Sequence, residues 1–386
     1  MHFRGFRRAS QDNISYCKTM KRDVYTITAA VVRSPGGPFD LEEVQIEGPR
    51  AGEILIRIVS SGICGTDLEF ASMMNLPVVL GHEGAGVVEA LGEGVDGLEI
   101  GGKVAMSFAH CGQCRTCLAS APAYCEHFWE YNFIGTRPDG STALSRDGQP
   151  VNGHFLGQSS FATHAVVRRS SVVRVPDDTD LHLVGPFGCG FQTGAGAVLN
   201  VLRPEPGSSI AVFGVGGVGA AAVMAAASVG CGTVIAVDIM DARLDQARGF
   251  GATHAVRSDS ADLQDKLRDI APGGLDYTID ATGRTDVLRN AVDALAPLGR
   301  CGVVGVGPSP EMIFEWRSVL AGRTITGITA GNSIPATFLP QLLDLHRAGH
   351  FPVDTLLTEF PFSDINSAVE AVRAGAVGKA VLVMDS

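Results

Sequence analysis

A glycine-rich loop between a strand and a helix constrains the fold of this chain more than any other feature. Residues 209–213 read as a buried strand, and Gly-Val-Gly-Gly-Val-Gly follows at once at residues 214–219. The first glycine of such a loop makes a tight turn, the second lets the backbone approach a pyrophosphate, and the third lets the helix pack on the strand. We therefore predict a dinucleotide site whose phosphates lie at the N-terminus of the following helix.

The end of the next predicted strand indicates which dinucleotide binds. Residues 233–237 form that strand, and Asp238 follows, nineteen residues after the last glycine of the loop. A carboxylate there hydrogen-bonds the adenosine ribose and repels a 2′-phosphate, so NAD is favoured over NADP. Arg243 either contacts the same ribose or is a solvated helix charge. The expected cofactor contacts in this segment are Gly214, Gly216, Gly217, Val218, Gly219, Asp238 and Arg243.

Four cysteines within fifteen residues predict a metal site. Cys111, Cys114, Cys117 and Cys125 have a spacing with which thiolates can wrap one tetrahedral Zn²⁺ and close its coordination shell. Disulfides are the alternative, but they need an oxidising compartment, and the sequence gives no sign of a secretory signal. We therefore expect a structural zinc in this segment.

A second set of metal-binding side chains is spread along the chain. Cys64 lies in Gly-Ile-Cys-Gly-Thr-Asp, His82 in Gly-His-Glu-Gly and Cys189 in Gly-Cys-Gly. Two thiolates and an imidazole leave one position on zinc open, which is the pattern of a catalytic site. Taken singly, such a cysteine is usually a small core residue, and only the fold can bring the three together.

Composition argues against several classes of function. The net charge of −11 argues against nucleic acid or an anionic membrane surface as the main partner. No stretch of the sequence is long and apolar enough to span a bilayer. Nine cysteines in an acidic chain suggest reduced thiols and metal, so we expect a cytoplasmic protein.

The pattern along the chain predicts an α/β protein with two domains. Residues 1–22 are basic and are expected to be a disordered extension; a transit peptide is the alternative. Residues 23–189 read as short strands between glycine-rich turns, which predicts a mostly antiparallel β domain. Residues 190–328 alternate apolar strands with helices, which predicts a doubly wound parallel sheet. Residues 329–386 are expected to return to the first domain.

Together, these motifs resemble the zinc-dependent medium-chain alcohol dehydrogenases over nearly the whole chain. The segments that carry the resemblance are residues 62–67, residues 81–86, the four-cysteine segment and the glycine loop. Within that family, residues 153–162 and 185–196 look most like aryl-alcohol (benzyl alcohol) dehydrogenases, and terpene-alcohol enzymes such as geraniol dehydrogenases share these runs. The resemblance implies a GroES-like catalytic domain, a Rossmann domain, an active site in the cleft between them, and a homo-oligomer, either dimer or tetramer.

The resemblance also implies roles for the residues around the catalytic metal. Cys64, His82 and Cys189 match the zinc ligands, and Glu83 matches a carboxylate that exchanges with the water on the zinc. Asp67 matches the partner that orients the ligand histidine.

Four further positions are identified in the same way. Thr66 matches the hydroxyl that contacts the substrate oxygen, and Lys379 falls where relatives place a basic residue near the cofactor phosphates. Gly65 departs from the Arg or His that many relatives place against the pyrophosphate, so cofactor affinity or release is expected to differ. Glu69 falls where some relatives carry a histidine that ends a proton relay, and either Glu69 or water is then the terminal acceptor.

The function predicted from these residues is the reversible oxidation of a primary aromatic or allylic alcohol by NAD, with two Zn²⁺ per chain. Phe108, Trp129, Phe155 and Leu156 either line an apolar substrate pocket or belong to the core.

Other readings of the same residues stay open. A terpene-alcohol (geraniol-type) or glutathione-adduct dehydrogenase on the same scaffold is the alternative, and Arg137 and Arg146 are the candidates for binding an anionic adduct. A non-catalytic NAD- or zinc-binding protein is disfavoured because all three catalytic ligands are present.

Overall fold

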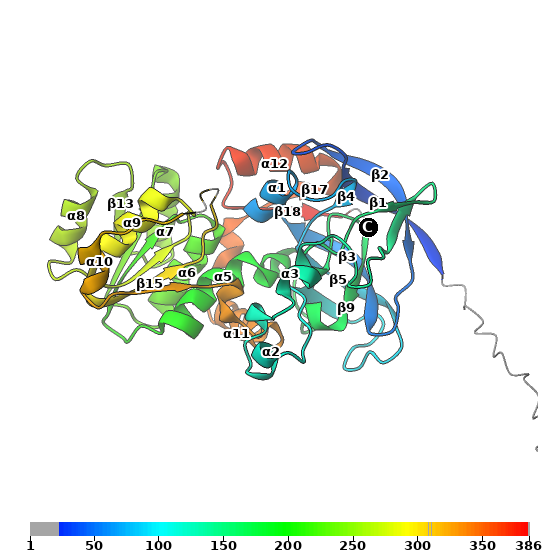
Figure 1. Cartoon of the computed structure of the whole chain (residues 1–386), viewed down its shortest axis with the longest axis horizontal. Helices are drawn as coiled ribbons and strands as arrows, with labels where there is room; N and C mark the ends of the chain where they lie inside the picture. Colours follow the sequence, from blue (N-terminus) through cyan, green and yellow to red (C-terminus); the bar gives the residue numbers. More distant parts are fainter. Residues whose placement is uncertain (1–22, 308, 310, 385–386) are drawn as a thin grey trace, which may run out of the picture.

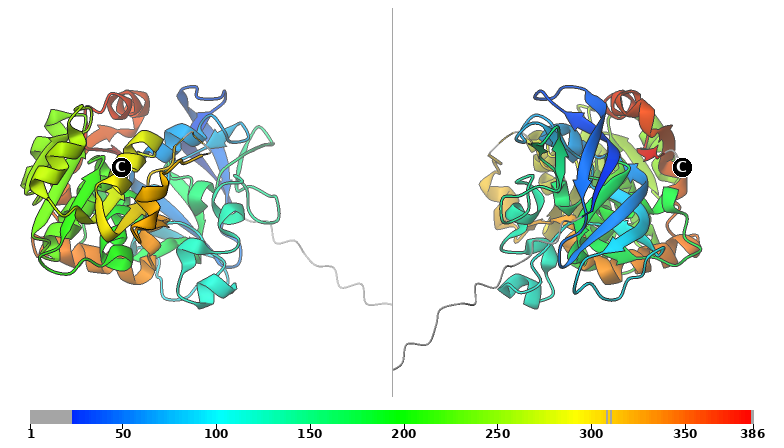
Figure 2. Two further views of the ribbon diagram at one scale, coloured as in Figure 1. Left: turned by 60° about the vertical axis from the view of Figure 1, so that its left-hand side comes forward. Right: turned by 90° about the vertical axis from the view of Figure 1, so that its right-hand side faces the viewer.

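The computed structural model describes residues 23–307, 309 and 311–384, and the predicted N-terminal extension lies outside them. Strands that are mostly antiparallel form one half of the molecule, and a parallel sheet with its helices forms the other (Figure 1). The left view of Figure 2 again shows the two halves side by side, and the right view shows the blue strands of the first half in front of the second. The predicted fold class is thereby confirmed.

Two sheets form the first half. One has the strand order β4-β1-β2-β7-β8, and the other has the order β10-β6-β5-β3-β18-β17 with β9 also paired to β3. In β3, Ile54, Leu55 and Ile56 are all buried, so both faces of this central strand are covered along part of its length. The bounds are β1 Val24–Val32, β2 Phe39–Glu47, β3 Glu53–Gly62, β4 Val78–Val79, β5 Glu83–Leu91, β6 Lys103–Met106, β7 Leu144–Arg146, β8 Gln149–Val151, β9 His164–Arg168 and β10 Val172–Arg174.

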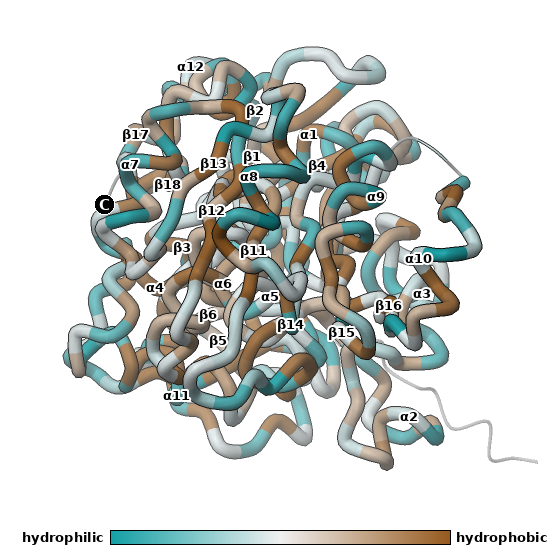
Figure 3. The backbone as a smooth tube through the Cα atoms, turned by 90° about the vertical axis from the view of Figure 1, so that its left-hand side faces the viewer, coloured by the Kyte–Doolittle hydropathy of each residue, from teal (hydrophilic) through white to brown (hydrophobic). Residues whose placement is uncertain are grey.

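A six-stranded parallel sheet forms the second half, in the order β13-β12-β11-β14-β15-β16. The order reverses between β11 and β14, and ligands of such sheets bind in the crevice at that point. The strands are β11 Ser209–Phe213, β12 Thr233–Asp238, β13 His254–Arg257, β14 Leu275–Asp280, β15 Leu295–Val303 and β16 Thr324–Gly327. Figure 3 shows hydrophobic residues along the central strands and many hydrophilic ones on the helices outside them.

Helices cover this sheet and join it to the rest of the chain. They are α6 Gly217–Ser228, α7 Asp241–Gly249, α8 Leu263–Ile270, α9 Thr285–Asp293 and α10 Trp316–Leu320. Helix α6 is buried along most of its length because it lies between the sheet and α5 (Gly190–Gly196). A Cβ atom on Gly194 would lie 1.9 Å from the carbonyl oxygen of Val218, so the two helices are in contact through their backbones.

The C-terminal segment returns to the first half of the molecule. After α11 (Pro335–Arg347), β17 (Leu357–Pro361) and α12 (Ile365–Arg373), strand β18 (Lys379–Val383) pairs with β3, with Val381 opposite Gly62. The exact domain boundaries stay predictions.

Short helices surround the region between the halves. They are α1 Gly65–Phe70, α2 Arg115–Leu118, α3 Phe128–Asn132 and α4 Leu181–Val184, with 3₁₀ turns that include η2 Phe155–Gly157 and η4 Gly185–Gly188. Over the described residues, none of the helices has the length and apolar character needed to cross a membrane.

Candidate active site

The fold brings together the three dispersed metal-binding side chains. Cys64 precedes α1, His82 precedes β5, and Cys189 lies between η4 and α5, so each comes from a different part of the chain. Their ligand atoms and a carboxylate oxygen of Glu83 all lie within 4.8 Å of one another. His82 is buried, and its Nε2 has no hydrogen-bond partner. A buried unpaired imidazole nitrogen beside two thiols fits a zinc ion, because zinc would satisfy all three.

Asp67 holds two of these ligands in place. Its Oδ1 lies 2.8 Å from His82 Nδ1 and also accepts the Gly81 N–H, while Oδ2 accepts the Cys64 N–H at 3.0 Å. Burial lowers the pKa of His82, but the charge and hydrogen bond of Asp67, together with Cys64, outweigh it and raise this pKa well above its ordinary value. A carboxylate on Nδ1 leaves Nε2 to face the metal, an arrangement that fixes the ring of many ligand histidines.

Two amide side chains fix the backbone near the ligands. Gln158 donates to the carbonyl of His82 at 2.7 Å and accepts the N–H of Gly84 at 3.1 Å. Gln192 donates to the Ser107 hydroxyl at 2.7 Å, and Ser107 donates to the carbonyl of Gly188, next to Cys189. Both amides lie in runs that carry the family resemblance, residues 153–162 and 185–196, but the sequence did not predict these hydrogen bonds because the partners are far away along the chain.

Glu83 and Lys379 form a buried ion pair beside the metal cluster. Lys379 Nζ lies 2.5 Å from Glu83 Oε2 and donates to the carbonyl of Ile63 at 3.1 Å. Burial raises the pKa of Glu83 to about 7, although the Lys379 charge opposes this. Carbon Cδ of Lys379 would also lie 3.9 Å from a Cβ atom on Gly217, so the lysine reaches from the metal cluster to the glycine loop.

The four-cysteine segment folds so that its four sulfur atoms lie close together. The ligand atoms of Cys111, Cys114, Cys117 and Cys125 lie within 4.8 Å of one another. The Cys111 sulfur accepts the N–H groups of Gln113 and Cys114 at 3.4 and 3.3 Å. Backbone N–H groups that point at sulfur stabilise thiolates. The segment therefore fits a second zinc ion, whose four coordination positions the four sulfur atoms would fill.

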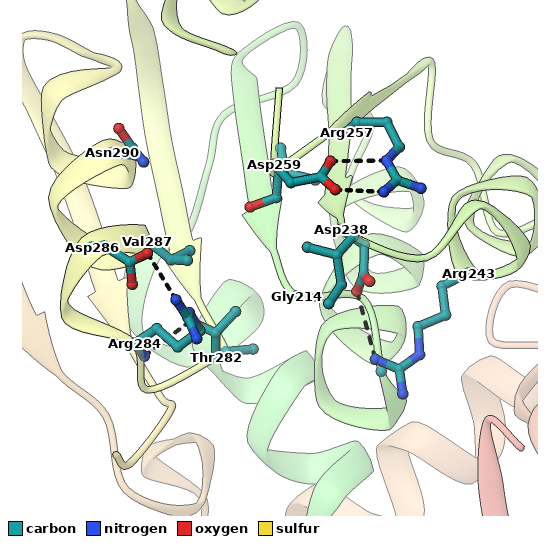
Figure 4. A pocket seen from close by; sticks show the side chains of 15 residues that line it. Gly214, Asp238, Arg243, Arg257, Asp259, Thr282, Arg284, Asp286, Val287 and Asn290 are labelled. Carbon is teal, nitrogen blue, oxygen red and sulfur yellow. Dashed lines mark hydrogen bonds and ion pairs between the residues drawn. The ribbon is translucent and has the colours of Figure 1, made fainter. Parts of the chain in front are cut away.

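The glycine loop and Asp238 lie at the crevice where the strand order reverses. A cavity of about 730 Å³ there is lined by Gly214, Gly216, Asp238 and Arg243, among others (Figure 4). Gly214 has φ +83°, and a Cβ on Gly219 would lie 1.8 Å from the carbonyl oxygen of Gly214, so both positions require glycine. Gly217 and Val218 begin α6, whose N-terminal N–H groups suit a pyrophosphate.

Asp238 also accepts two backbone hydrogen bonds that the sequence did not predict. Its Oδ2 accepts the N–H of Val215 at 2.8 Å and its Oδ1 accepts the N–H of Met240 at 2.9 Å. The Arg243 guanidinium lies 3.8 Å from Oδ2, and Figure 4 shows the two side chains directed toward one another. Asp238 therefore shapes the glycine loop as well as offering a carboxylate to the crevice.

A second cavity, of about 640 Å³, opens from the catalytic metal cluster. Its lining includes Cys64, Thr66, Glu69, His82 and Cys189, and the predicted pocket residues Phe108, Trp129 and Leu156. Phe155 is fully buried and does not line the cavity; its ring stands edge-on to His82, with 5.6 Å between centroids.

Several residues of the cavity wall were not expected from the sequence. They are Phe70, Tyr124, Phe128, Phe133, Val304, Val306 and Ile328. The aromatic run at residues 128–133 is the signal that could have pointed to some of them, whereas Val304, Val306 and Ile328 come from the other half of the molecule.

Comparison with known proteins agrees with this geometry. The alcohol dehydrogenase GroES-like domain matches residues 50–177, and the zinc-binding dehydrogenase model matches residues 217–347. The chain belongs to the zinc-dependent medium-chain alcohol dehydrogenases. Members of this family generally use zinc and NAD(H).

Three relatives illustrate how close the similarity is. A geraniol dehydrogenase from Castellaniella defragrans is 42% identical over 370 residues, which cover 94% of this chain and 99% of the relative. The crystal structure of an alcohol dehydrogenase zinc-binding domain protein from Burkholderia ambifaria is 45% identical, with a TM-score of 0.92. That of a benzyl alcohol dehydrogenase from Acinetobacter calcoaceticus is 39% identical, with a TM-score of 0.90. Each of these structures is covered completely and covers 94% of this chain.

The two arginines considered for an anionic substrate lie elsewhere in this dehydrogenase. Arg137 is buried in ion pairs with Glu53 and Glu47, and Arg146 pairs with Glu42. Among the described residues that line the cavity at the metal cluster there is no lysine or arginine. The described lining therefore offers no lysine or arginine side chain to the carboxylates of a glutathione adduct.

Proposed function

We propose that this dehydrogenase oxidises a primary alcohol with an aromatic or allylic carbon next to the carbinol to the aldehyde, reversibly, with NAD as hydride acceptor. The observation that carries the proposal is the aromatic cavity that ends at the Cys64, His82 and Cys189 cluster. The geraniol dehydrogenase and benzyl alcohol dehydrogenase among the relatives support the substrate class. Conjugation also stabilises the aldehyde product and so favours hydride loss.

In this proposal, the metal ligands, the cofactor crevice and the hydroxyl of Thr66 each contribute a different part of the reaction. Zinc held by Cys64, His82 and Cys189 would supply a Lewis acid for the alcohol oxygen, and NAD in the crevice would supply the hydride acceptor. The Thr66 hydroxyl lies 3.7 Å from the Cys64 sulfur and lines the cavity, which supports a role for it in accepting the proton of the alcohol. Glu69 lines the same cavity and is exposed, so either its carboxylate or water receives that proton from Thr66.

The proposal includes two zinc ions per chain, one in each cysteine cluster. It also includes a homo-oligomer, dimer or tetramer, and a cytoplasmic location. The location is supported by the cysteines of the described residues, which form no disulfide.

A terpene alcohol such as geraniol is the second candidate substrate, favoured by the relative named above and by the size of the cavity. Its allylic carbinol offers the same chemistry as benzyl alcohol. A non-catalytic NAD- or zinc-binding protein is disfavoured, because both metal clusters and the crevice are complete.

A substrate panel tests the proposal. We expect benzyl alcohol, cinnamyl alcohol and geraniol to exceed ethanol in kcat/KM with NAD by about 10²-fold or more, because ethanol leaves most of an apolar wall unfilled. Cys64→Ser should abolish turnover, whereas the matched Cys231→Ser, at a cysteine outside both clusters, should not. Equal efficiency for ethanol and benzyl alcohol would contradict the aromatic or allylic assignment.

A further inference from the structure

The chain passes between the two halves of the molecule twice. It leaves the first half after β10 and returns to it before β17, and the two crossing segments contain α5 and the 3₁₀ turn η6 (Ala330–Asn332), respectively. The crossings contact each other through their backbones, because a Cβ atom on Gly196 of α5 would lie 2.3 Å from the carbonyl oxygen of Gly331. The placement of the two halves therefore depends on how α5 and η6 pack together.

The turn η6 has a backbone conformation that its residue types do not favour. Ala330, Gly331 and Asn332 have φ of 45°, 65° and 46°, so three consecutive residues lie in the left-handed region and only one of them is glycine. Such a backbone persists only where its surroundings fix it. Ile328, Thr329 and Ala330 line the cavity at the metal cluster, so the conformation of this turn shapes part of the cavity wall.

Side chains on and next to α5 hold this turn. The Ser333 hydroxyl donates to Gln192 Oε1 at 2.6 Å, and Asn200 Nδ2 donates to the carbonyl of Gly331 at 3.0 Å. Gln192 and Ser333 are both fully buried. Their hydrogen bond therefore lies in a low dielectric, where it is electrostatically stronger than a hydrogen bond in water.

The other end of the Gln192 side chain reaches the backbone at the metal cluster. Its Nε2 donates to the Ser107 hydroxyl at 2.7 Å and to the carbonyl of Gly188, the residue before Cys189. Ser107 donates to the same carbonyl at 2.7 Å. Because a carbonyl can only accept, the NH₂ of Gln192 must face Gly188 and its amide oxygen must face Ser333. One glutamine thus bonds both the backbone beside a metal ligand and the turn in the cavity wall.

We propose that Gln192 is a positioning residue for hydride transfer, because it fixes Cys189 and the cavity wall at residues 328–330 relative to one another. The inference rests on the proposed function, since it assumes that the alcohol binds at the metal cluster and NAD in the crevice of the parallel sheet. Gln192 itself lines neither cavity. A misplacement of about 1 Å, caused far from the reacting atoms, can slow a reaction about 10²-fold.

Single-turnover kinetics of the holoenzyme test this role. Gln192→Met keeps the length of the side chain but makes none of its hydrogen bonds. With NAD and benzyl alcohol, the rate constant for NADH formation should fall about tenfold. The amplitude, which measures the fraction of folded enzyme, should change much less. The matched control is Gln246→Met, which loses a hydrogen bond to the Thr355 carbonyl outside the lining of both cavities. An unchanged rate constant in Gln192→Met, whatever its amplitude, would overturn the proposal.

Two further variants separate the two ends of the side chain. Ser333→Ala removes the bond at the cavity wall, and Ser107→Ala removes the bonds beside Gly188. If Gln192 connects the two ends, breaking one end leaves little for the second break to change. The double variant should then have a rate constant within about threefold of the slower single variant. Effects that multiply in the double variant would show that the two ends act independently and would overturn the connection.

Zinc release tests the metal end without turnover. In an excess of a chromogenic chelator, Gln192→Met and Ser107→Ala should lose zinc several times faster than wild type and Ser333→Ala, with Cys64→Ser showing the release from the four-cysteine segment alone. Faster release in a protein that oxidises no alcohol would keep Gln192 as the residue that positions Cys189 and would remove the proposed function. Alcohol turnover with equal zinc release and equal single-turnover rate constants would do the reverse.

Discussion

At the scale of single residues, His154 shows how one buried side chain makes stability depend on pH. Its Nε2 accepts the N–H of Ala143 at 3.3 Å, which requires the neutral ring. Burial, helped by the charge of Arg137, lowers its pKa from 6.5 to about 4. Because the folded pKa is the lower one, this contribution to stability is complete above about pH 6.5 and is lost as the pH falls toward 4.

A substitution at His154 should therefore change the acid sensitivity of the protein. Asparagine tolerates the left-handed backbone of this residue, φ 57°. Between pH 7.5 and pH 5, wild type should lose about 2 kcal/mol more of its free energy of unfolding than His154→Asn does. Thermal melts of both proteins at the two pH values measure this, with His254→Asn at an exposed position as the control. Parallel losses in all three proteins would show that His154 is protonated in the folded state.

A second prediction at the scale of single residues is that Asp238 determines the preference for NAD over NADP. Asp238→Ala removes the carboxylate that would repel a 2′-phosphate and leaves Arg243 free to pair with it. We expect weaker NAD binding and a relative gain for NADP, measured as the two dissociation constants by titration. The loop also loses the acceptor of the Val215 N–H, so binding of both nucleotides should weaken somewhat. The double variant Asp238→Ala/Arg243→Ala should lose the relative gain; a wild type that already prefers NADP would refute the assignment.

At the scale of elements, we predict that the four-cysteine segment is a unit held by its own zinc ion. Purified protein should contain about two zinc ions per chain, and Cys114→Ser and Cys64→Ser should each contain about one. Because the segment has little apolar core of its own, Cys114→Ser should also lower the melting temperature far more than Cys64→Ser does. Elemental analysis and thermal melts measure both, with Cys231→Ser as the matched control. Two zinc ions in Cys114→Ser would mean that the segment does not bind one.

At the scale of the whole molecule, the contact between α5 and α6 ties the parallel sheet to the catalytic half. A Cβ on Gly194 would lie 1.9 Å from the carbonyl oxygen of Val218, so Gly194→Ala must force the helices apart. We expect a loss of about 1–3 kcal/mol in the free energy of unfolding. Gly249→Ala, at the end of α7 with no atom within 4 Å of the new Cβ, should be neutral or stabilising by up to about 1 kcal/mol. Equal melting temperatures for the two variants would contradict the close contact between α5 and α6 described above.

The sequence by itself determined the features whose parts are close together along the chain. The glycine loop with Asp238 and the four-cysteine segment each lie within about thirty residues, so spacing alone predicted their local shape and their ligands. The change from short strands to alternating strands and helices likewise predicted the two kinds of sheet, because each has its own period of hydrophobicity.

Only the tertiary structure decided the features that join distant segments. Cys64, His82 and Cys189 meet because β3, β5 and η4 contact one another, and no local pattern encodes that meeting. The residues that line the cavity at the metal cluster come from both halves of the molecule. Composition alone therefore could not distinguish Trp129, which lines the cavity, from Phe155, which is buried and does not. Arg137 was a candidate for a substrate anion until the fold placed it against Glu53 and Glu47. The type of a side chain fixes its chemistry. Its role in the protein depends on the distant groups that the packing of the fold brings into contact with it.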